Sequence, residues 1–499
     1  MADFVDIPLG QPVPDSPHAV LCSLPRLADI IGYEERRPET IAAMRVGYPR
    51  FLTNPLVAKA QGVAERELGG AGQAVRLVQS KALAAGLAEF VGPRAGAPQP
   101  WRGAWAVKIP NDAELLARAK CFHQHVGAAI TSRQAEDILV EAGALPVRFA
   151  ETTYAGDAEA KIRANLAEAY ELADASDILL TGSGMTAFYT VFNAVRAAQR
   201  ARGRHRWLQL GWQYVDTTEV LKKFLNPGEQ WHFWPDVFDL AGLEAFFQEH
   251  GAKIAGVVAE FPTNPLLQAG DLPGLQALCN KHGAVLLVDP TLASPRVVNV
   301  LPHSDVVINS LTKFAANEGD VMAGAVVFNP QSPWAKALRG TVASALPPHY
   351  PRDLARLAAQ IDGYAPMVEK ASISAARLID FLRGHPAVKA VYWPGEGRSR
   401  DNFARLARGS YTTGGVFSFS LRGDLARFYD RVRVVKGPSF GVNFTLICPF
   451  MYLAHYDLVN QAAGRQQLAA LGLDPELIRV SVGTEPYEQI EAAFLAALA

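Results

Sequence analysis

Cysteine is scarce in this chain. Its 499 residues include four cysteines, Cys22, Cys121, Cys279 and Cys448, which lie far apart and form no C-x-x-C pair. This excludes a disulfide scaffold and a structural zinc ribbon, and it fits a reducing compartment. The first residues also lack the basic and apolar regions of a signal peptide. We therefore expect a cytoplasmic protein without a metal centre.

An excess of charge is also missing. The 48 Lys and Arg residues nearly balance the 49 Asp and Glu residues, so the formal net charge is −1, and no basic block stands out. Nucleic acid and membrane surfaces are therefore not expected partners. The longest uncharged run, Gly437 to Ala454, contains Pro438, Asn443 and Pro449, so it is too interrupted to span a bilayer. We expect it to be buried or to line a site.

Short apolar runs and helical patterns dominate what is present. Residues 1–60 are expected to form an irregular arm, and residues 61–150 mix Ala-rich helical patterns with a loop around GAPQPWRG. From about residue 158, helical patterns alternate with the runs DILL, WLQLGW, IAGVVAEF, AVLLVD, DVVINS and GAVVFN. This predicts an α/β protein with a mostly parallel sheet covered on both faces.

The pattern changes after about residue 335. A long helical stretch is followed by the strand candidates KAVYW and GVFSFSL and by a final helix. We therefore expect a large domain over residues 61–335, including an extra helical segment at about 61–150, and a small C-terminal α+β domain over residues 336–499.

A Gly-rich turn in TGSGMTA lies between a predicted strand and a predicted helix. Gly182-x-Gly184-x-x-Ala187 superficially matches a dinucleotide fingerprint, but no acid ends the next strand, and Asp216 comes only after the following turn. What remains is an anion or phosphate site at a helix N-terminus, or simply a tight turn. A hydrolase is not supported because G-x-S-x-G is absent.

Two further strands end in reactive side chains. Asp289 ends AVLLVD, and Ser310, Thr312 and Lys313 follow the next apolar run. Alone, such an Asp is often a helix cap and such a Lys is usually solvated. Because the carboxyl ends of parallel strands share one crevice, however, a phosphate site, a carboxylate and an amine converge there. Pyridoxal phosphate (PLP) requires this combination, since a lysine binds it covalently and a carboxylate keeps its pyridine nitrogen protonated.

The order of short motifs carries a resemblance. SGM, NP, VDxT, SxTK, GPS and RVSVG, in this order, resemble the Cys/Met-metabolism family of fold-type I PLP enzymes, the relatives of cystathionine γ-synthase and γ-lyase. SLPRLADIIGYEE, GYPRF, YVDT, GPSFGVNFTLICPF and LIRVSVG are similar to the longer, fungal-type cystathionine γ-synthases. The resemblance runs from about residue 22 to the C-terminus. It implies an aspartate-aminotransferase-like fold and PLP as the cofactor.

The resemblance also implies roles for individual residues. Lys313 would bind the cofactor covalently and act as the catalytic base, and Asp289 would face the pyridine nitrogen. Tyr214 would stack on the cofactor ring, and Asn264 would approach its phenolic oxygen. An ordinary structural role is the alternative for Tyr214 and Asn264, and equally for Tyr48 and Arg479.

The cofactor phosphate and the substrate carboxylate account for the remaining positions. Gly184 and Met185 would bind the phosphate through the backbone, and Ser310 and Thr312 through their hydroxyls. The substrate carboxylate would be bound by Ser439 and Arg479.

The Y-x-R element, Tyr48 and Arg50, would reach the phosphate of a neighbouring subunit. The partners would then be small amino-acid substrates and further copies of this chain, in a homodimer or homotetramer with shared active sites.

Two departures from the family pattern touch the pocket walls. The chain has Tyr214-Val215-Asp216 where members commonly have Y-G-G or Y-G-C, and Asp289-Pro290-Thr291 where they have D-N-T. The long gap between Tyr48 and Gly184 is a third departure, and the extra segment in it could be a structural insert, an oligomer contact or a pocket lid.

The activity that the resemblance implies is γ-replacement on O-acetyl- or O-succinylhomoserine with cysteine, which gives cystathionine. Elimination needs the same residues, so a γ-lyase or a specialised γ-eliminase that makes an unsaturated amino acid is the alternative. A non-catalytic or nucleotide-binding α/β protein is the alternative from another class.

Overall fold

In the buried strands of the central sheet, successive apolar side chains point to opposite faces. The computed structural model describes residues 6–499. In β10 (Val285–Asp289), Val285 and Leu287 face one hydrophobic core, and Leu286 and Val288 face another. A strand that is apolar on both sides must be covered on both faces, so its sequence favours a sheet between two layers of helices.

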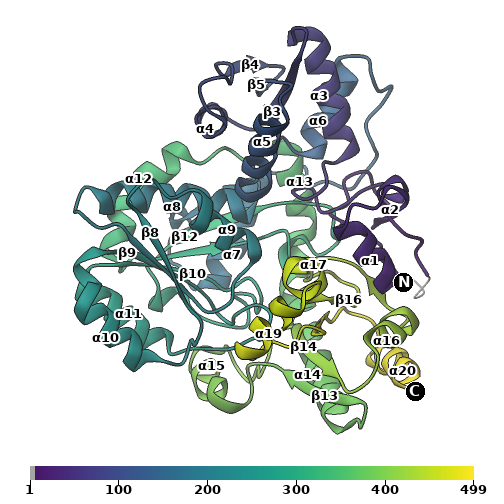
Figure 1. Ribbon diagram of the computed structural model, residues 1–499, viewed down its shortest axis with the longest axis vertical. Coiled ribbons are helices and arrows are strands. Elements are labelled where there is room, and N and C mark those ends of the chain that lie inside the picture. Colours follow the sequence, from purple (N-terminus) through teal and green to yellow (C-terminus); the bar gives the residue numbers. More distant parts are fainter. Residues whose placement is uncertain (1–5) are drawn as a thin grey trace.

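This sheet has seven strands in the order β6-β12-β11-β10-β9-β7-β8 and is mostly parallel, as predicted (Figure 1). The exception is β12, which pairs antiparallel with β11 and β6. All six apolar runs form strands, whereas β8 was not predicted. The other strands are β6 (Ile178–Thr181), β7 (Arg206–Leu210), β8 (Gln230–Trp234), β9 (Ile254–Glu260), β11 (Val306–Asn309) and β12 (Gly324–Phe328).

Helices from different parts of the chain cover the two faces of this sheet. One core contains side chains of α8 (Gly184–Arg200), α9 (Val215–Lys223) and α12 (Pro333–Ala345). The other contains side chains of α7 (Ala158–Tyr170), α10 (Leu240–His250), α11 (Leu272–His282) and α13 (Pro351–Gln360). The sheet therefore lies between two layers of packed helices, and the carboxyl ends of its strands lie between these layers.

A second sheet, of five strands, forms the core of the C-terminal part in the order β13-β14-β17-β16-β15. It is antiparallel except for the pair β15 and β16. Its strands are β13 (Val388–Tyr392), β14 (Val416–Leu421), β15 (Val435–Lys436), β16 (Leu446–Pro449) and β17 (Ile478–Ser481). Its helices are α14 (Tyr364–Gly384), α15 (Arg400–Leu406), α16 (Leu425–Arg431), α17 (Phe450–Ala454), α18 (Tyr456–Val459), α19 (Ala462–Ala470) and α20 (Tyr487–Leu498).

Residues 55–141, here named the N-terminal insert, form a layer of their own at the top of Figure 1. An antiparallel sheet, β3-β5-β4, lies between α3 and α6 on one side and α4 and α5 on the other. The elements are α3 (Pro55–Leu68), β3 (Gln73–Val78), α4 (Lys81–Val91), β4 (Gln99–Trp101), β5 (Ala104–Pro110), α5 (Ala113–Val126) and α6 (Ser132–Glu141). The helical patterns and the loop predicted for residues 61–150 left out these three strands, of which β4 lies within the expected loop GAPQPWRG.

The N-terminal arm packs against the C-terminal part of its own chain. Ile30 and Tyr33 of α1 (Leu27–Glu34) lie in the hydrophobic core of the second sheet. Before them, β1 (Pro12–Val13) pairs with β2 (Leu21–Cys22), and α2 (Pro38–Ala43) follows. The first five residues of the expected arm lie outside the described residues. Within residues 6–499, no helix has both the length and the hydrophobicity that crossing a bilayer requires.

Candidate active site

One cavity lies where the carboxyl ends of β9, β10 and β11 meet the C-terminal part of the chain. It encloses about 1250 Å³, including space open to solvent. All the residues predicted for the site line this cavity except Thr312, namely Tyr48, Arg50, Gly184, Met185, Tyr214, Asn264, Asp289, Ser310, Lys313, Ser439 and Arg479. The ends of these strands therefore bring the side chains to one cavity, as the sequence led us to expect.

Thr312 does not have the position expected from the resemblance. Its side chain is buried, and its hydroxyl donates to the backbone oxygen of Ala323 at 3.2 Å and accepts from the Ala323 N–H at 3.0 Å. Ala323 directly precedes β12, the antiparallel strand beside β11. The Thr312 hydroxyl therefore ties the end of β11 to the approach to β12, and its role as a phosphate ligand stays a prediction.

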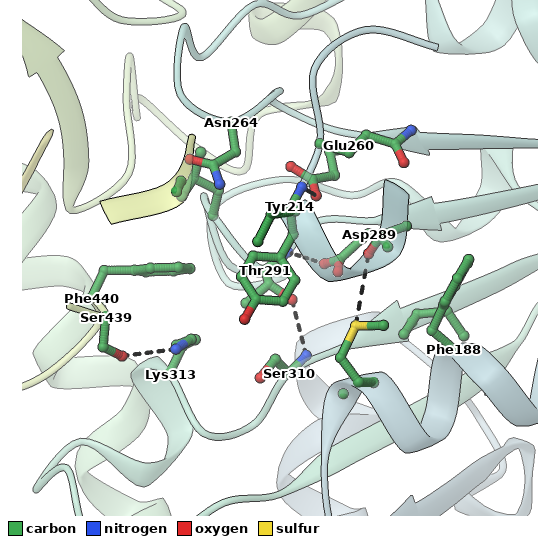
Figure 2. Close-up of a pocket in the computed structure, with 18 of the residues that line it drawn as sticks. Phe188, Tyr214, Glu260, Asn264, Asp289, Thr291, Ser310, Lys313, Ser439 and Phe440 are labelled. Atoms are coloured by element: carbon green, nitrogen blue, oxygen red, sulfur yellow. Dashed lines mark hydrogen bonds between the residues drawn. The ribbon is translucent and has the colours of Figure 1, made fainter. Parts of the chain in front are cut away.

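Lys313 extends into the cavity beside Ser439 (Figure 2). Its Nζ donates to Ser439 Oγ at 2.7 Å and lies 3.5 Å from Tyr48 Oη. Burial lowers the pKa of Lys313, and the guanidinium groups of Arg479 and Arg50 lower it further, against the opposing effect of Tyr48. A lowered pKa raises the fraction of the lysine amine that is neutral at a given pH, and only the neutral amine can act as a nucleophile or a base.

Ser439 holds this lysine from a strained backbone. Its φ is 93°, in the left-handed region that residues other than glycine seldom adopt. Such strain costs about 1–3 kcal/mol and persists only where the surroundings impose it. The conformation places Ser439 Oγ next to Lys313 Nζ, while the Ser439 backbone oxygen accepts from Arg479.

Asp289 lies at the end of β10, in register with Glu260 at the end of β9 (Figure 2). Burial raises the pKa of Asp289 to about 6, although the Thr291 N–H donates to its Oδ1 at 2.8 Å. Burial and then the neighbouring Asp289 raise the pKa of Glu260 well above its ordinary value. Burial therefore disfavours two adjacent negative charges at this edge of the sheet.

The N-terminus of α8 forms one end of the cavity. Ser183 caps this helix, since its Oγ accepts from the Thr186 N–H at 3.1 Å, and Gly184 and Met185 begin the first turn. The first N–H groups of a helix have no partner within it, so they favour an anion. Ser310 comes close to this turn, because a Cβ on Gly184 would lie 2.9 Å from Ser310 Cβ. This end of the cavity can hold a phosphate.

Tyr214 and Arg50 form a wall beside that turn. Arg50 Nη2 donates to Tyr214 Oη, and Arg50 Nη1 donates to Asp216 Oδ2 and to the backbone oxygen of Gln124 at 2.8 Å. The Tyr214 N–H donates to Glu260 Oε1 at 2.6 Å. The tyrosine is thereby fixed at both its backbone and its hydroxyl.

The contacts of Tyr48 and Arg50 differ from one expectation. From the resemblance, both side chains should reach the site of a neighbouring subunit. In the structure they contact Lys313 and Tyr214 of their own chain. The Y-x-R element therefore lines the cavity of its own chain in the structure.

Arg479 and Asn264 meet on the side of the cavity formed by the C-terminal part. Arg479 Nη1 donates to Asn264 Oδ1 at 3.1 Å, and Nη2 donates to the Ser439 backbone oxygen at 3.0 Å. The guanidinium lies 5.0 Å and 4.6 Å from the ring centres of Phe440 and Phe450. A guanidinium held in one plane by these contacts suits a planar carboxylate.

Three residues that contribute to the site were missed. Glu260 ends a predicted strand, so its position next to Asp289 was a usable signal. Asp216 was recognised only as a departure from the family pattern. His125 has no local signal, because its partner Asp216 lies 91 residues further along the chain.

The donor set fits PLP. A buried lysine, a buried carboxylate, a helix N-terminus and an aromatic ring surround one cavity, which is the chemistry that the amine, pyridine, phosphate and ring contacts of PLP need. Among the described residues, no group of three or more His, Cys, Asp and Glu side chains is arranged to hold a metal ion.

Comparison with known proteins gives the family. The model of the Cys/Met metabolism PLP-dependent enzymes matches residues 159–499. The chain belongs to this family. It is 39% identical to an L-2-amino-4-chloropent-4-enoate dechlorinase/desaturase of Streptantibioticus cattleyicolor, over 97% of each chain. It is 33% identical to cystathionine γ-synthase of Neurospora crassa, over 64% of this chain and 52% of that enzyme.

A solved structure shows the fold. Cystathionine γ-synthase of Xanthomonas oryzae pv. oryzae superposes with a TM-score of 0.58 at 24% identity, covering 69% of this chain and 86% of that one. The protein is therefore a fold-type I, PLP-dependent enzyme of the γ-synthase and γ-lyase type. The alternative of a non-catalytic or nucleotide-binding protein is set aside.

Proposed function

We propose that the protein removes a small leaving group from Cγ of an L-α-amino acid with a short, apolar side chain. The observation that carries this proposal is the apolar wall next to Arg479, formed by Phe440, Phe450, Leu453 and Ala454. A substrate bound through its α-carboxylate at Arg479 places its side chain near this wall.

The charges around the cavity support a small, uncharged γ-substituent. Lys313, Arg50 and Arg479 are the cations among the described residues that line the cavity, and each is hydrogen-bonded within the protein. Arg479 is assigned to the α-carboxylate, and Arg50 faces Tyr214 and Asp216. A second carboxylate, such as that of O-succinylhomoserine, would find no free cation there and would lose hydration without compensation.

The Streptantibioticus relative supports the same reaction class. Its name describes the removal of chlorine from position 4 of a five-carbon amino acid, which is Cγ. The similarity extends over 97% of both chains, so it includes the N-terminal insert as well as the catalytic part.

The residues of the cavity can carry out this reaction. When bound, PLP withdraws electrons from the substrate α-carbon. Arg479 orients the α-carboxylate, and Asp289 holds the proton on the pyridine nitrogen. Lys313 would take the proton from Cα and pass it on to the cofactor, and the neutral amine would then take one from Cβ, which allows the Cγ substituent to leave with its bonding electrons. Ser439 keeps the lysine amine in reach of both carbons, and the aromatic wall excludes water from the reactive product.

A second candidate is γ-replacement on O-acetylhomoserine with cysteine. The similarity to the Neurospora crassa cystathionine γ-synthase favours it. The acetyl leaving group is uncharged, so it is compatible with the apolar wall.

One experiment separates the candidates. The purified enzyme is incubated with L-2-amino-4-chloropent-4-enoate, O-acetylhomoserine or O-succinylhomoserine, each with and without cysteine, and products are identified by mass spectrometry. Release of chloride or acetate without cysteine supports elimination. Cystathionine formed only with cysteine supports replacement. If the PLP-loaded enzyme turns over none of these compounds, the proposal of a small γ-leaving group is wrong.

A further inference from the structure

Arg50 is held by contacts on several sides although its side chain reaches the cavity from the N-terminal arm. Its guanidinium contacts Asp216, Tyr214 and the backbone oxygen of Gln124, and its side chain is only 5% exposed. Two of these three contacts depend on residues outside the set predicted for the site. The position of Arg50 is therefore imposed by the surrounding chain.

Asp216 connects Arg50 to the N-terminal insert. Its side chain is fully buried, and its second oxygen, Oδ1, lies 2.7 Å from His125 Nδ1. His125 belongs to the last turn of α5, next to Gln124. The other ring nitrogen of His125 faces Lys223 Nζ at 3.2 Å, and Glu219 balances that amine at 2.7 Å. One helix of the insert thus supplies both a direct and an indirect contact to Arg50.

The same end of α5 docks on the phosphate end of the cavity. Thr186 Oγ1, in the first turn of α8, lies 3.1 Å from the backbone oxygens of Val126 and Gly127. A Cβ on Gly127 would collide with Ser183 Oγ and would lie 3.5 Å from Arg50 Cδ. The end of α5, the start of α8 and Arg50 therefore meet at Gly127.

We propose that Asp216 and His125 are positioning residues through which the N-terminal insert holds Arg50 in the active site of its own chain. The insert would then do within one chain what a neighbouring subunit would do if active sites were shared. This inference rests on PLP as the cofactor and not on the substrate proposed above. It assigns a role to a segment that precedes the family match, which begins at residue 159.

Cofactor affinity tests the positioning role without any substrate. Apoprotein is titrated with PLP and followed by absorbance for the wild type, Asp216→Asn, His125→Gln and the control Asp401→Asn, whose carboxylate is 88% exposed. We expect PLP affinity to fall by roughly 10- to 100-fold in Asp216→Asn and by a smaller factor in His125→Gln, because hydrogen bonds to charged groups are lost. The control should match the wild type. Unchanged or tighter binding in Asp216→Asn would overturn the proposal.

A double-mutant cycle distinguishes positioning from general damage to the fold. If Asp216 acts through Arg50, Arg50→Ala with Asp216→Asn binds PLP no more weakly than Arg50→Ala alone. Additive losses would contradict the proposal. Arg50→Lys replaces Arg50→Ala if the alanine variant does not fold, since lysine keeps the charge but loses the forked geometry.

Mixed oligomers test whether the site belongs to one chain. Differently tagged Lys313→Ala and Arg50→Ala chains are co-expressed, purified through both tags and passed over gel filtration, and the retained, covalently bound PLP is measured. A site within one chain predicts no more retained PLP than the Arg50→Ala protein alone shows. PLP retained at the wild-type level on half of the chains would mean that Arg50 serves a neighbouring subunit, and the proposal would fail. Because no turnover is needed, this result is independent of the proposed reaction.

Discussion

Glu260 and Asp289 stand side by side at the ends of two neighbouring parallel strands, and burial raises the pKa of both carboxyl groups. Asp289 has a pKa raised to about 6 by burial, so it is ionised at pH 7.5. Glu260 has its pKa raised well above its ordinary value by burial and by Asp289 itself. Burial and the closeness of the two groups therefore disfavour two negative charges here, and the larger shift lies on Glu260.

This difference predicts opposite outcomes for two amide substitutions. Glu260→Gln removes the ionisable group that burial disfavours as an anion and keeps an oxygen that can accept from the Tyr214 N–H, so PLP affinity should stay within about 3-fold of the wild type. Asp289→Asn removes the charge opposite the pyridine nitrogen, and turnover should fall by roughly 10- to 100-fold, since hydrogen bonds to charged groups contribute about 1.5–3 kcal/mol. Titration with PLP and steady-state kinetics measure both. Equal losses in the two variants would show that Glu260 also carries charge.

Ser439→Ala tests the contact that orients the lysine. The substitution removes the oxygen 2.7 Å from Lys313 Nζ but leaves the backbone oxygen that accepts from Arg479. We expect kcat to fall about 5-fold, in line with the loss of a hydrogen bond worth about 1 kcal/mol, with KM nearly constant. Kinetics on any substrate that the enzyme turns over measure the split. A change in KM alone would place Ser439 at the substrate carboxylate instead.

Arg479→Lys tests the carboxylate site. Lysine keeps the charge but presents a single ammonium in place of a planar fork, so KM should rise by about 10- to 100-fold. PLP affinity of the apoprotein is the matched control and should not change. A variant with an unaltered KM would show that Arg479 serves only to brace Asn264 and Ser439.

Gly127→Ala tests the junction between the insert and α8. Gly127 has a φ of 72°, and a side chain there would press on the Ser183 oxygen that caps α8. The left-handed backbone alone costs a residue other than glycine about 1–3 kcal/mol. We expect a lower Tm and weaker PLP binding together. Gly143→Ala, which has φ 67° and open space around it, isolates the backbone cost and should lower Tm while leaving PLP binding unchanged.

The contact of His125 with Asp216 should make the free energy of unfolding decrease as the pH rises. Burial alone lowers the pKa of His125, but Asp216 and Cys121 outweigh it and raise the pKa from 6.5 to about 9. A raised folded-state pKa means that the stabilisation is complete below pH 6.5 and is lost as the pH rises through 9. The difference in free energy of unfolding between wild type and His125→Gln should therefore be largest near pH 6 and should shrink by on the order of 2 kcal/mol by pH 9.5. Denaturant unfolding at several pH values measures it, and a constant difference would contradict the ion pair.

The parts of the molecule that could be predicted are those in which local pattern determines position. The apolar runs around Val285–Asp289 and Val306–Asn309 predict buried strands, and parallel strands bring Asp289 and Lys313 to one edge. The strand β8 was missed because it lies at the edge of the sheet and is only half-buried after Gln230, so it lacks the continuous apolar run that marks the other strands. The strands of the insert were missed because Ala-rich helices flank them and Ala itself favours helix.

Contacts between segments far apart in the sequence are the part of the site that no local pattern predicts. The hydroxyl of Thr312 is occupied because β12 returns antiparallel next to β11, which no short motif indicates. Arg50 depends on Asp216, 166 residues away, and Asp216 on His125, 91 residues away. The sequence contains each of these residues, but it does not show which of them are in contact, because these contacts depend on how the layers pack together.

The distance along the chain between Tyr48 and Lys313, 265 residues, has a consequence for synthesis on the ribosome. The cavity draws on the arm at Tyr48, the strand ends of the central sheet and Arg479, so a nascent chain has all of its cavity residues only after residue 479 has been translated. Domains that emerge earlier can fold as units, but none of them contains a complete cavity. Tight binding of the cofactor should therefore require chains that extend past residue 479, and fragments that end before it should leave the ribosome without the cofactor.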